Sequence, residues 1–128
     1  MNRSRLFTLA GACALALFAS SCGKDSPSGP SDGGTIAATI TITAAGVSPK
    51  AVTVAAGSRV MFVNNDSRPH TMNSDPHPEH TDCQELNVGF ISAGSSGTTL
   101  NLNTPRVCGY HDHNQPDVVA LQGTITIQ

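Results

Sequence analysis

Short stretches in which apolar and polar residues alternate recur from residue 35 to the end of the chain. Within residues 59–65, Val60, Phe62 and Asn64 fall on one face of an extended chain, and Met61 and Val63 fall on the other. Because turns rich in Gly, Pro and Asn separate these stretches, the pattern predicts an all-β antiparallel sandwich. Strands are expected at residues 35–44, 51–54, 59–65, 98–102 and 123–128, with the stretch RVCGY between the last two.

The stretch between Asn65 and Ser95 breaks this alternation. It is polar and interrupted by proline, so it predicts a long surface excursion rather than a central strand. Aromatic residues make up only 4% of the chain. We therefore expect Phe62, Phe90 and Tyr110 to anchor a core that is otherwise built from Val, Ile and Leu.

The first 34 residues have a different character. Arg3 and Arg5 precede an apolar run from Leu6 to Phe18, which is typical of a secretory signal peptide and too short for a mature membrane span. The ASSC that follows resembles a bacterial lipobox, in which Cys22 is lipidated; cleavage without a lipid is the alternative. We expect a signal peptide at 1–21, lipidated Cys22 with a flexible Gly/Ser/Pro tether at 22–34, and one folded domain at 35–128. These features predict an exported, membrane-anchored lipoprotein of the periplasm or cell surface.

The charge balance excludes one class of partner. Without Arg3 and Arg5 of the signal peptide, the seven Lys and Arg become five, against nine Asp and Glu, which gives a net charge of −4. So few cations form no basic stripe, and binding to nucleic acid is not expected. Contact with a membrane is expected only through the N-terminal lipid anchor.

Histidine and cysteine supply the candidate chemistry. All five histidines lie outside the expected strands: His70, His77, His80, His111 and His113. With Cys83 and Cys108 beside them they are typical of a metal-ligand set, because imidazole and thiolate bind copper and zinc. In an exported domain the two cysteines also suit a disulfide, since that compartment is oxidising. Both interpretations stay open for Cys108.

Two motifs resemble the cupredoxins, the small blue copper proteins. The first is GVSPKAVTVAAGSRVMFVNNDSRPHTM, which ends in an Asn-Asp-x-x-x-His turn that places His70 at the family's first histidine ligand. The second is CGYHDHNQP followed by GTITIQ, in which Cys108 and His111 match the family's cysteine and second histidine with plastocyanin-type C-x-x-H spacing. The resemblance covers most of residues 47–128 and implies a Greek-key β-sandwich.

The resemblance also implies a mononuclear copper site with His70, Cys108 and His111 as ligands. In such a site a thiolate and two imidazoles hold the copper ion, and a weak axial ligand tunes its potential. The implied function is electron transfer with a redox protein partner, as a carrier rather than an enzyme.

The axial position departs from the family pattern. No methionine follows His111, so the candidates for an axial ligand are Gln115, His113 and Asn114, and His77 and His80 are further candidates for an additional ligand. An amide ligand at Gln115 would resemble the stellacyanin-like branch. A third imidazole would make a different kind of copper site.

The insert SDPHPEHTDC is a second departure. It places His77, His80 and Cys83 at a ligand-like spacing. Three arrangements stay open. Cys108 binds copper as a thiolate, Cys108 helps to bind zinc, or Cys108 is bonded to Cys83 and the metal is held by histidines alone, namely His70, His111, His113 and one of His77 or His80. The last would make the protein a copper or zinc binding and scavenging module. The nearby acidic residues are interpreted as solvated side chains or as hydrogen-bond partners of ligands: Asp75, Glu79, Asp82 and Glu85.

Overall fold

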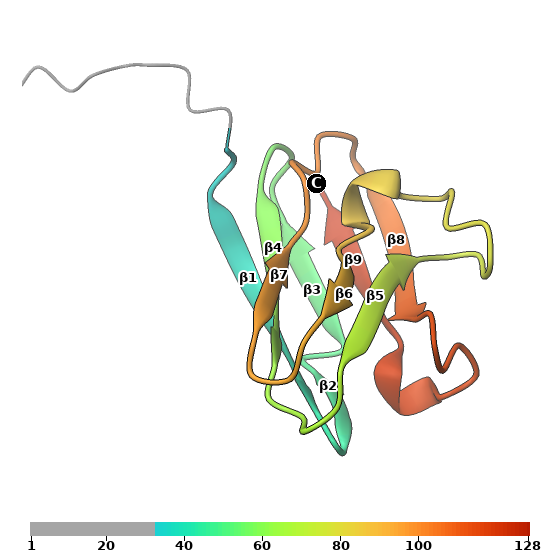
Figure 1. Ribbon diagram of the computed structural model, residues 1–128. Helices are drawn as coiled ribbons and strands as arrows, with labels where there is room; N and C mark the ends of the chain where they lie inside the picture. The colour runs from blue at the N-terminus through green and yellow to red at the C-terminus, as the bar shows by residue number, and fades with distance from the viewer. Residues whose placement is uncertain (1–32) are drawn as a thin grey trace, which may run out of the picture.

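Two β-sheets form a sandwich in the computed structural model, which describes residues 33–128 (Figure 1). The strands are β1 (Ile36–Thr43), β2 (Gly46–Ser48), β3 (Ala51–Val54), β4 (Arg59–Asn64), β5 (His70–Ser74), β6 (Gly89–Ile91), β7 (Ser96–Thr98), β8 (Arg106–Asp112) and β9 (Gly123–Ile127). Two short 3-10 helices, η1 (Gln84–Leu86) and η2 (Val119–Leu121), lie in the connections. The prediction of an all-β sandwich is confirmed, although the strand expected at 98–102 lies earlier, as β7.

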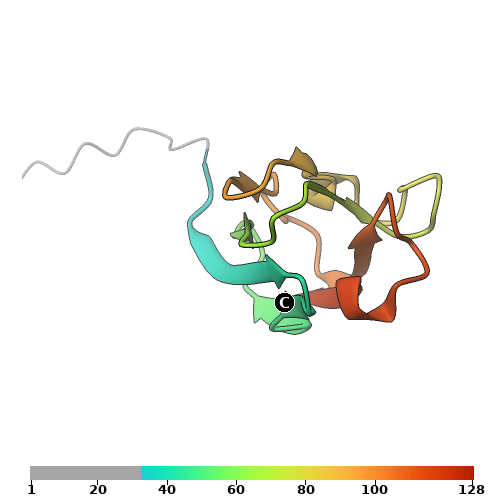
Figure 2. The ribbon, with the colours of Figure 1, turned by 60° about the horizontal axis from the view of Figure 1, so that its bottom comes forward.

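One sheet has the strand order β2-β1-β4-β7, and the other has the order β3-β9-β8-β5-β6. Both sheets are mixed rather than purely antiparallel, because β1 pairs with β4 and β3 pairs with β9 in parallel. The chain path explains the first pair. After the β1–β2 hairpin the chain crosses to the other sheet as β3 and returns as β4, which then runs in the direction of β1. Figure 2 shows the molecule turned so that the two layers are seen from below.

The core lies between the sheets and follows the alternation in the sequence. In β4, Val60, Phe62 and Asn64 are buried, and the residues between them are partly exposed, as predicted. The ring of Phe62 meets that of Tyr110 in β8 edge to face, with centroids 5.2 Å apart. This aromatic pair joins the two sheets at the centre of the core.

The segment between Asn65 and Ser95 is not a single surface excursion, so that prediction is wrong. It contains β5, which lies inside the five-stranded sheet, and β6 at the edge of that sheet. The alternation of β5 is hard to recognise because its inward side chains are His70, Met72 and Ser74, two of which are polar. Phe90 of β6 points away from the core and is 68% exposed, so its predicted role as a core anchor is also wrong.

Strand β8 continues through a segment that the resemblance treats as a loop. Its alternate residues Cys108, Tyr110 and Asp112 are buried on the inner side of the sheet. Cys108 forms a disulfide with Cys83, and the two Cα atoms lie 5.9 Å apart. In this structure Cys108 is therefore not a free thiolate.

The predicted signal peptide and the lipidated Cys22 lie outside the described residues. In residues 33–128 no helix is long and apolar enough to cross a membrane. The boundaries at 1–21, 22–34 and 35–128 remain predictions.

We expect the domain, produced from residue 23 in an oxidising compartment, to show no free thiol after unfolding without reduction. A colorimetric thiol assay measures this, and two free thiols would contradict the disulfide. The bond closes a loop of 25 residues, and cross-links of that length stabilise a fold by about 3 kcal/mol. The double variant Cys83→Ser, Cys108→Ser should therefore lose about that much free energy of unfolding in a denaturant titration.

Candidate metal centre

The outer face of the five-stranded sheet carries the candidate centre. His111 follows Cys108 by three positions in β8, and an odd spacing places two side chains on opposite faces of a strand. Across the sheet, His111 is in register with Asn73 of β5. His113 comes directly after β8, and its backbone N–H donates to the carbonyl oxygen of Thr71 at 2.7 Å. The imidazoles of His111 and His113 thus come from the same side of the sheet.

The loop at residues 75–83 folds over this face and covers His111. Figures 1 and 2 show it on the same side of the sandwich as the segment that follows β8. At its start the N–H of Asp75 donates to the carbonyl oxygen of Gly109 at 3.1 Å. A side chain at Gly109 would collide with the Asp75 carboxylate, so the glycine permits the close approach. As a result His111 is only 2% exposed.

His80 adopts a backbone conformation that is uncommon for residues other than glycine, with φ of +54°. Three hydrogen bonds hold it there. Its N–H donates to the carbonyl of Pro76 at 2.7 Å, its ring Nδ1 donates to the carbonyl of Ser74 at 2.8 Å, and its own carbonyl accepts from Asn87 Nδ2 at 3.0 Å. Strain of this kind persists where the surroundings over-determine it, and it concentrates at functional sites.

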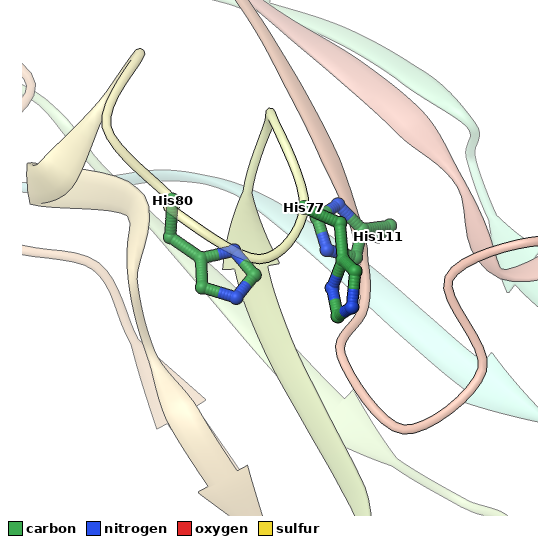
Figure 3. Close-up of side chains that lie close together, drawn as sticks. All are labelled: His77, His80 and His111. Atoms are coloured by element: carbon green, nitrogen blue, oxygen red, sulfur yellow. The ribbon is translucent and has the colours of Figure 1, made fainter.

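Three imidazoles converge at the centre, those of His77, His80 and His111 (Figure 3). Each offers a ring nitrogen, and these three atoms lie within 4.8 Å of one another. His113 joins the group, because its Nδ1 is 2.7 Å from Nε2 of His80 and its ring centroid is 4.9 Å from those of His77 and His80. Metal ions bind imidazole nitrogen at about 2.0–2.1 Å. The group can therefore hold a metal ion after small side-chain rotations.

A carboxylate orients His111. Its Nδ1 lies 2.6 Å from Oδ1 of Asp75, and because an ionised carboxylate only accepts hydrogen bonds, Nδ1 is the donor. The other nitrogen, Nε2, is then an acceptor, and it is buried without a hydrogen-bond partner. A buried polar atom without a partner is costly, and a metal ion would satisfy this one. Pairing with a carboxylate is also the usual way in which a metal-binding imidazole is fixed in orientation and tautomer.

His77 is the exposed member of the group. Desolvation lowers the pKa of His77, and the neighbouring imidazoles of His113, His111 and His80 lower it further. Metal ions bind only the neutral form of imidazole. The lowered pKa therefore keeps His77 ready to bind a metal ion at a more acidic pH than an isolated histidine.

The structure does not bring together the ligand set that the resemblance implies. Cys108 is in a disulfide on the inner face, and His70 is fully buried there. Nδ1 of His70 is 2.8 Å from Oδ2 of Asp112, and Nε2 is 3.0 Å from Oδ2 of Asp66, so both nitrogens are engaged. Only His111 of the three joins the histidine group. The reason is that C-x-x-H within a strand directs the thiol and the imidazole to opposite faces.

The other sequence candidates divide between the two faces. His77, His80 and His113 meet His111 on the outer face, whereas Nε2 of Gln115 lies 3.4 Å from Oδ2 of Asp112 on the inner side. Sequence reasoning gave no role to Asp112, and it noted Asp66 only as part of the Asn-Asp-x-x-x-His motif. The signal for Asp112 was its even spacing from Cys108 and Tyr110, which assigns it to the buried face once β8 is extended through it.

We expect Asp75→Asn to weaken metal binding by about 10- to 100-fold, which is the usual effect of losing the carboxylate partner of a ligating histidine. The control is Asp82→Asn, which removes the same charge from an exposed position in the same loop. A competition titration with copper(II) against a chelator of known affinity measures both. Equal affinities for the two variants would exclude a role for Asp75.

Acid stability gives a separate prediction for the inner face. The hydrogen bond from His70 lowers the pKa of Asp66 below its usual value. Such a group contributes stability above its unfolded pKa of about 3.9, and this contribution is lost as the pH falls through the lower folded value. We expect the metal-free protein to lose stability below about pH 4 and Asp66→Asn to lose less over the same range. Denaturant titrations of both proteins above and below this pH measure the two changes in free energy of unfolding. Equal losses in the wild type and in Asp66→Asn would exclude Asp66 as the cause.

Comparison with known proteins adds the fold family. No family model and no curated relative matches the sequence. Similar solved structures include a purple cupredoxin from Nitrosopumilus maritimus, the oxidized form of plastocyanin from Dryopteris crassirhizoma and amicyanin from Paracoccus versutus. Their TM-scores are 0.58, 0.56 and 0.57, at 22%, 18% and 16% sequence identity. The matches cover 71%, 70% and 79% of this chain and 99%, 99% and 86% of theirs.

Identities at this level establish the fold. The purple cupredoxin, the plastocyanin and the amicyanin are all cupredoxins, and their likeness to this chain concerns the fold alone. The chain therefore has the cupredoxin fold.

Proposed function

We propose that this protein binds one copper ion through the imidazoles of His77, His80 and His111, with His113 as the fourth ligand. The observation that carries the proposal is the state of His111. Its Nδ1 is fixed by Asp75, its Nε2 is buried and unpaired, and its ring centroid lies 5.4 Å from that of His77 and 5.1 Å from that of His80. An unpaired acceptor in a buried position is the feature that a bound metal ion explains best.

The donor set fits copper. Imidazole nitrogen suits copper, zinc, iron and nickel, and among divalent ions of the first row copper(II) binds a given set of nitrogen donors most tightly. Copper, when bound, supplies a centre that can alternate between Cu(I) and Cu(II). Zinc is the competing ion, because four imidazoles also satisfy its tetrahedral preference.

The four histidines differ in what each would contribute. Hydrogen bonds already fix the ring orientations of His111 and His80, the first to Asp75 and the second to the Ser74 carbonyl. His77 is exposed and lies on the side from which an ion would enter. His113 is half-buried, and its contact with His80 would be replaced by a shared metal ion.

The proposed centre contains no thiolate, because Cys108 is bonded to Cys83. A blue copper site depends on a thiolate ligand, so we propose a histidine-only centre that binds or scavenges copper. Electron transfer to a redox partner is the second candidate. It is favoured by ligand loops that are hydrogen-bonded in place on a rigid sandwich, which limits rearrangement when a metal changes its oxidation state. We propose binding or electron transport rather than catalysis.

We also propose that the protein is exported and anchored through Cys22. The disulfide supports export, because such bonds persist in oxidising compartments. Cys22→Ser should move the protein from the membrane fraction to the soluble fraction of its cells. Continued membrane association of that variant would exclude the anchor.

A titration with copper tests the proposed centre. The wild-type domain should bind one equivalent of copper(II) without the intense red absorption of a thiolate site, and its EPR spectrum should show coupling to several nitrogens. His111→Ala should lose tight binding, because it removes the buried ligand. The control is Val107→Ala, an exposed residue on the same face of β8. Tight binding by His111→Ala, or strong red absorption of the wild type, would overturn the histidine-only site.

The same copper-loaded sample separates the two candidate functions. A reversible Cu(II)/Cu(I) couple in protein voltammetry would support electron transfer. Loss of copper on reduction would support binding and release.

A further inference from the structure

A second polar group lies on the inner face of β5 and β8, directly behind the histidine centre. It consists of Asp66, His70 and Asp112, of which His70 and Asp112 are fully buried and Asp66 is 6% exposed. The His70 ring bridges the two carboxylates, with distances of 2.8 Å from Nδ1 to Asp112 and 3.0 Å from Nε2 to Asp66. We call this group the inner triad.

We infer that the inner triad is a positioning unit, which fixes His111 and His113 from the opposite face of β8. The inference rests on the proposed function. It assigns His70, the residue at the position of the first copper ligand in the resembling motif, to a role that needs no contact with the metal.

The hydrogen bonds of His70 leave it no nitrogen for a metal ion. Ionised carboxylates only accept hydrogen bonds, so each of the two bonds is satisfied when the ring nitrogen in it carries a proton. A metal ligand needs a ring nitrogen with a free lone pair. His111 meets that requirement at Nε2, and His70 does not.

Asp112 is the member that connects the triad to the outer face, because its backbone stands between His111 and His113 in the chain. Its Oδ1 accepts from the backbone N–H groups of Thr71 and Asn114, each at 3.1 Å. Its Oδ2 accepts from His70 and lies 3.4 Å from Nε2 of Gln115. One carboxylate thus ties the end of β8 to the start of β5 and to the next loop, so its orientation sets the backbone from which both histidines project.

A purely structural role does not explain why the carboxylates of Asp66 and Asp112 are buried here. Burying an ion pair costs desolvation that its attraction often fails to repay, and apolar residues of similar volume are commonly as stable. A carboxylate does what an apolar side chain cannot do: it accepts bonds from two backbone N–H groups of different segments and fixes their relation. Precision at the neighbouring ligands is therefore the function that the triad serves.

The first test uses the unmodified domain and zinc as a diamagnetic probe. We expect the imidazole ¹⁵N NMR signals of His70 to keep their positions when one equivalent of zinc is added. The signals of His77, His80 and His111 should move to those of metal-bound rings. A shift of the His70 signals to those of a metal-bound ring would make it a ligand and overturn the inference.

The second test uses Asp112→Asn, which keeps the shape of the side chain and its carbonyl acceptor but removes the charge that pairs with His70. We expect copper(II) affinity to fall at least about 10-fold, with an altered EPR spectrum, as when a supporting partner of a metal ligand is lost. The control is Val54→Ala in β3, a buried position in the edge strand of the same sheet. It should lower the thermal midpoint and leave the affinity and the spectrum unchanged.

The outcomes keep the two proposals apart. Unchanged affinity and spectrum in Asp112→Asn would overturn the positioning role, as would a Val54→Ala variant that shifts the spectrum equally. Failure of the histidine centre itself is read from His111→Ala, which changes no member of the inner triad. Should Asp112→Asn fail to fold, the zinc NMR experiment on the wild type still decides whether His70 is a ligand.

Discussion

Side chains alternate between the two faces of β8, and the rest of the candidate centre depends on that alternation. Cys108, Tyr110 and Asp112 point into the sandwich, while His111 points out of it. A thiolate and an imidazole three residues apart can share a metal ion only where the chain has left the strand. Because β8 pairs with β5 as far as Asp112, the two side chains are held on opposite sides of the sheet. The C-x-x-H motif is present, but in this arrangement its sulfur and its imidazole lie on opposite faces and do not meet at one metal ion.

The loop at residues 75–83 supplies the carboxylate that orients His111 and two of the other imidazoles of the centre. It begins on the outer face at Asp75, whose carboxylate fixes His111, and it ends in the core at Cys83. The disulfide to Cys108 therefore anchors the far end of the segment that carries His77 and His80 to the strand that carries His111. Gly109 lets the start of the loop approach β8. Anchoring at both ends explains how the positive φ of His80 is maintained.

Much of the fold could be predicted from the sequence, because most strands alternate apolar and polar residues. β4 is the clearest case, since Val60 and Phe62 are buried and alternate with partly exposed neighbours. β5 could not be recognised in this way, because its inward positions include His70, a polar residue whose burial depends on carboxylates four and 42 positions away. The prediction for Phe90 was wrong for a different reason. A strand of a sandwich exposes one of its two faces, and the hydrophobicity of one residue does not show which face carries it. The histidine group was recognisable as a set of ligands, but the choice among its members required the extent of β8.

The inner triad and the histidine centre are two solutions to the same problem, the burial of imidazole beside the strands β5 and β8. On the inner face, carboxylates on both sides of His70 form hydrogen bonds with both ring nitrogens. Neither nitrogen is therefore open to a metal ion. On the outer face, a single carboxylate satisfies one nitrogen of His111 and leaves the other open. The two imidazoles therefore differ by one carboxylate partner, and of the two only His111 keeps a ring nitrogen without a hydrogen bond. Asp112 links the two groups, since it accepts a hydrogen bond from His70 in the inner one and stands in the backbone between His111 and His113 of the outer one.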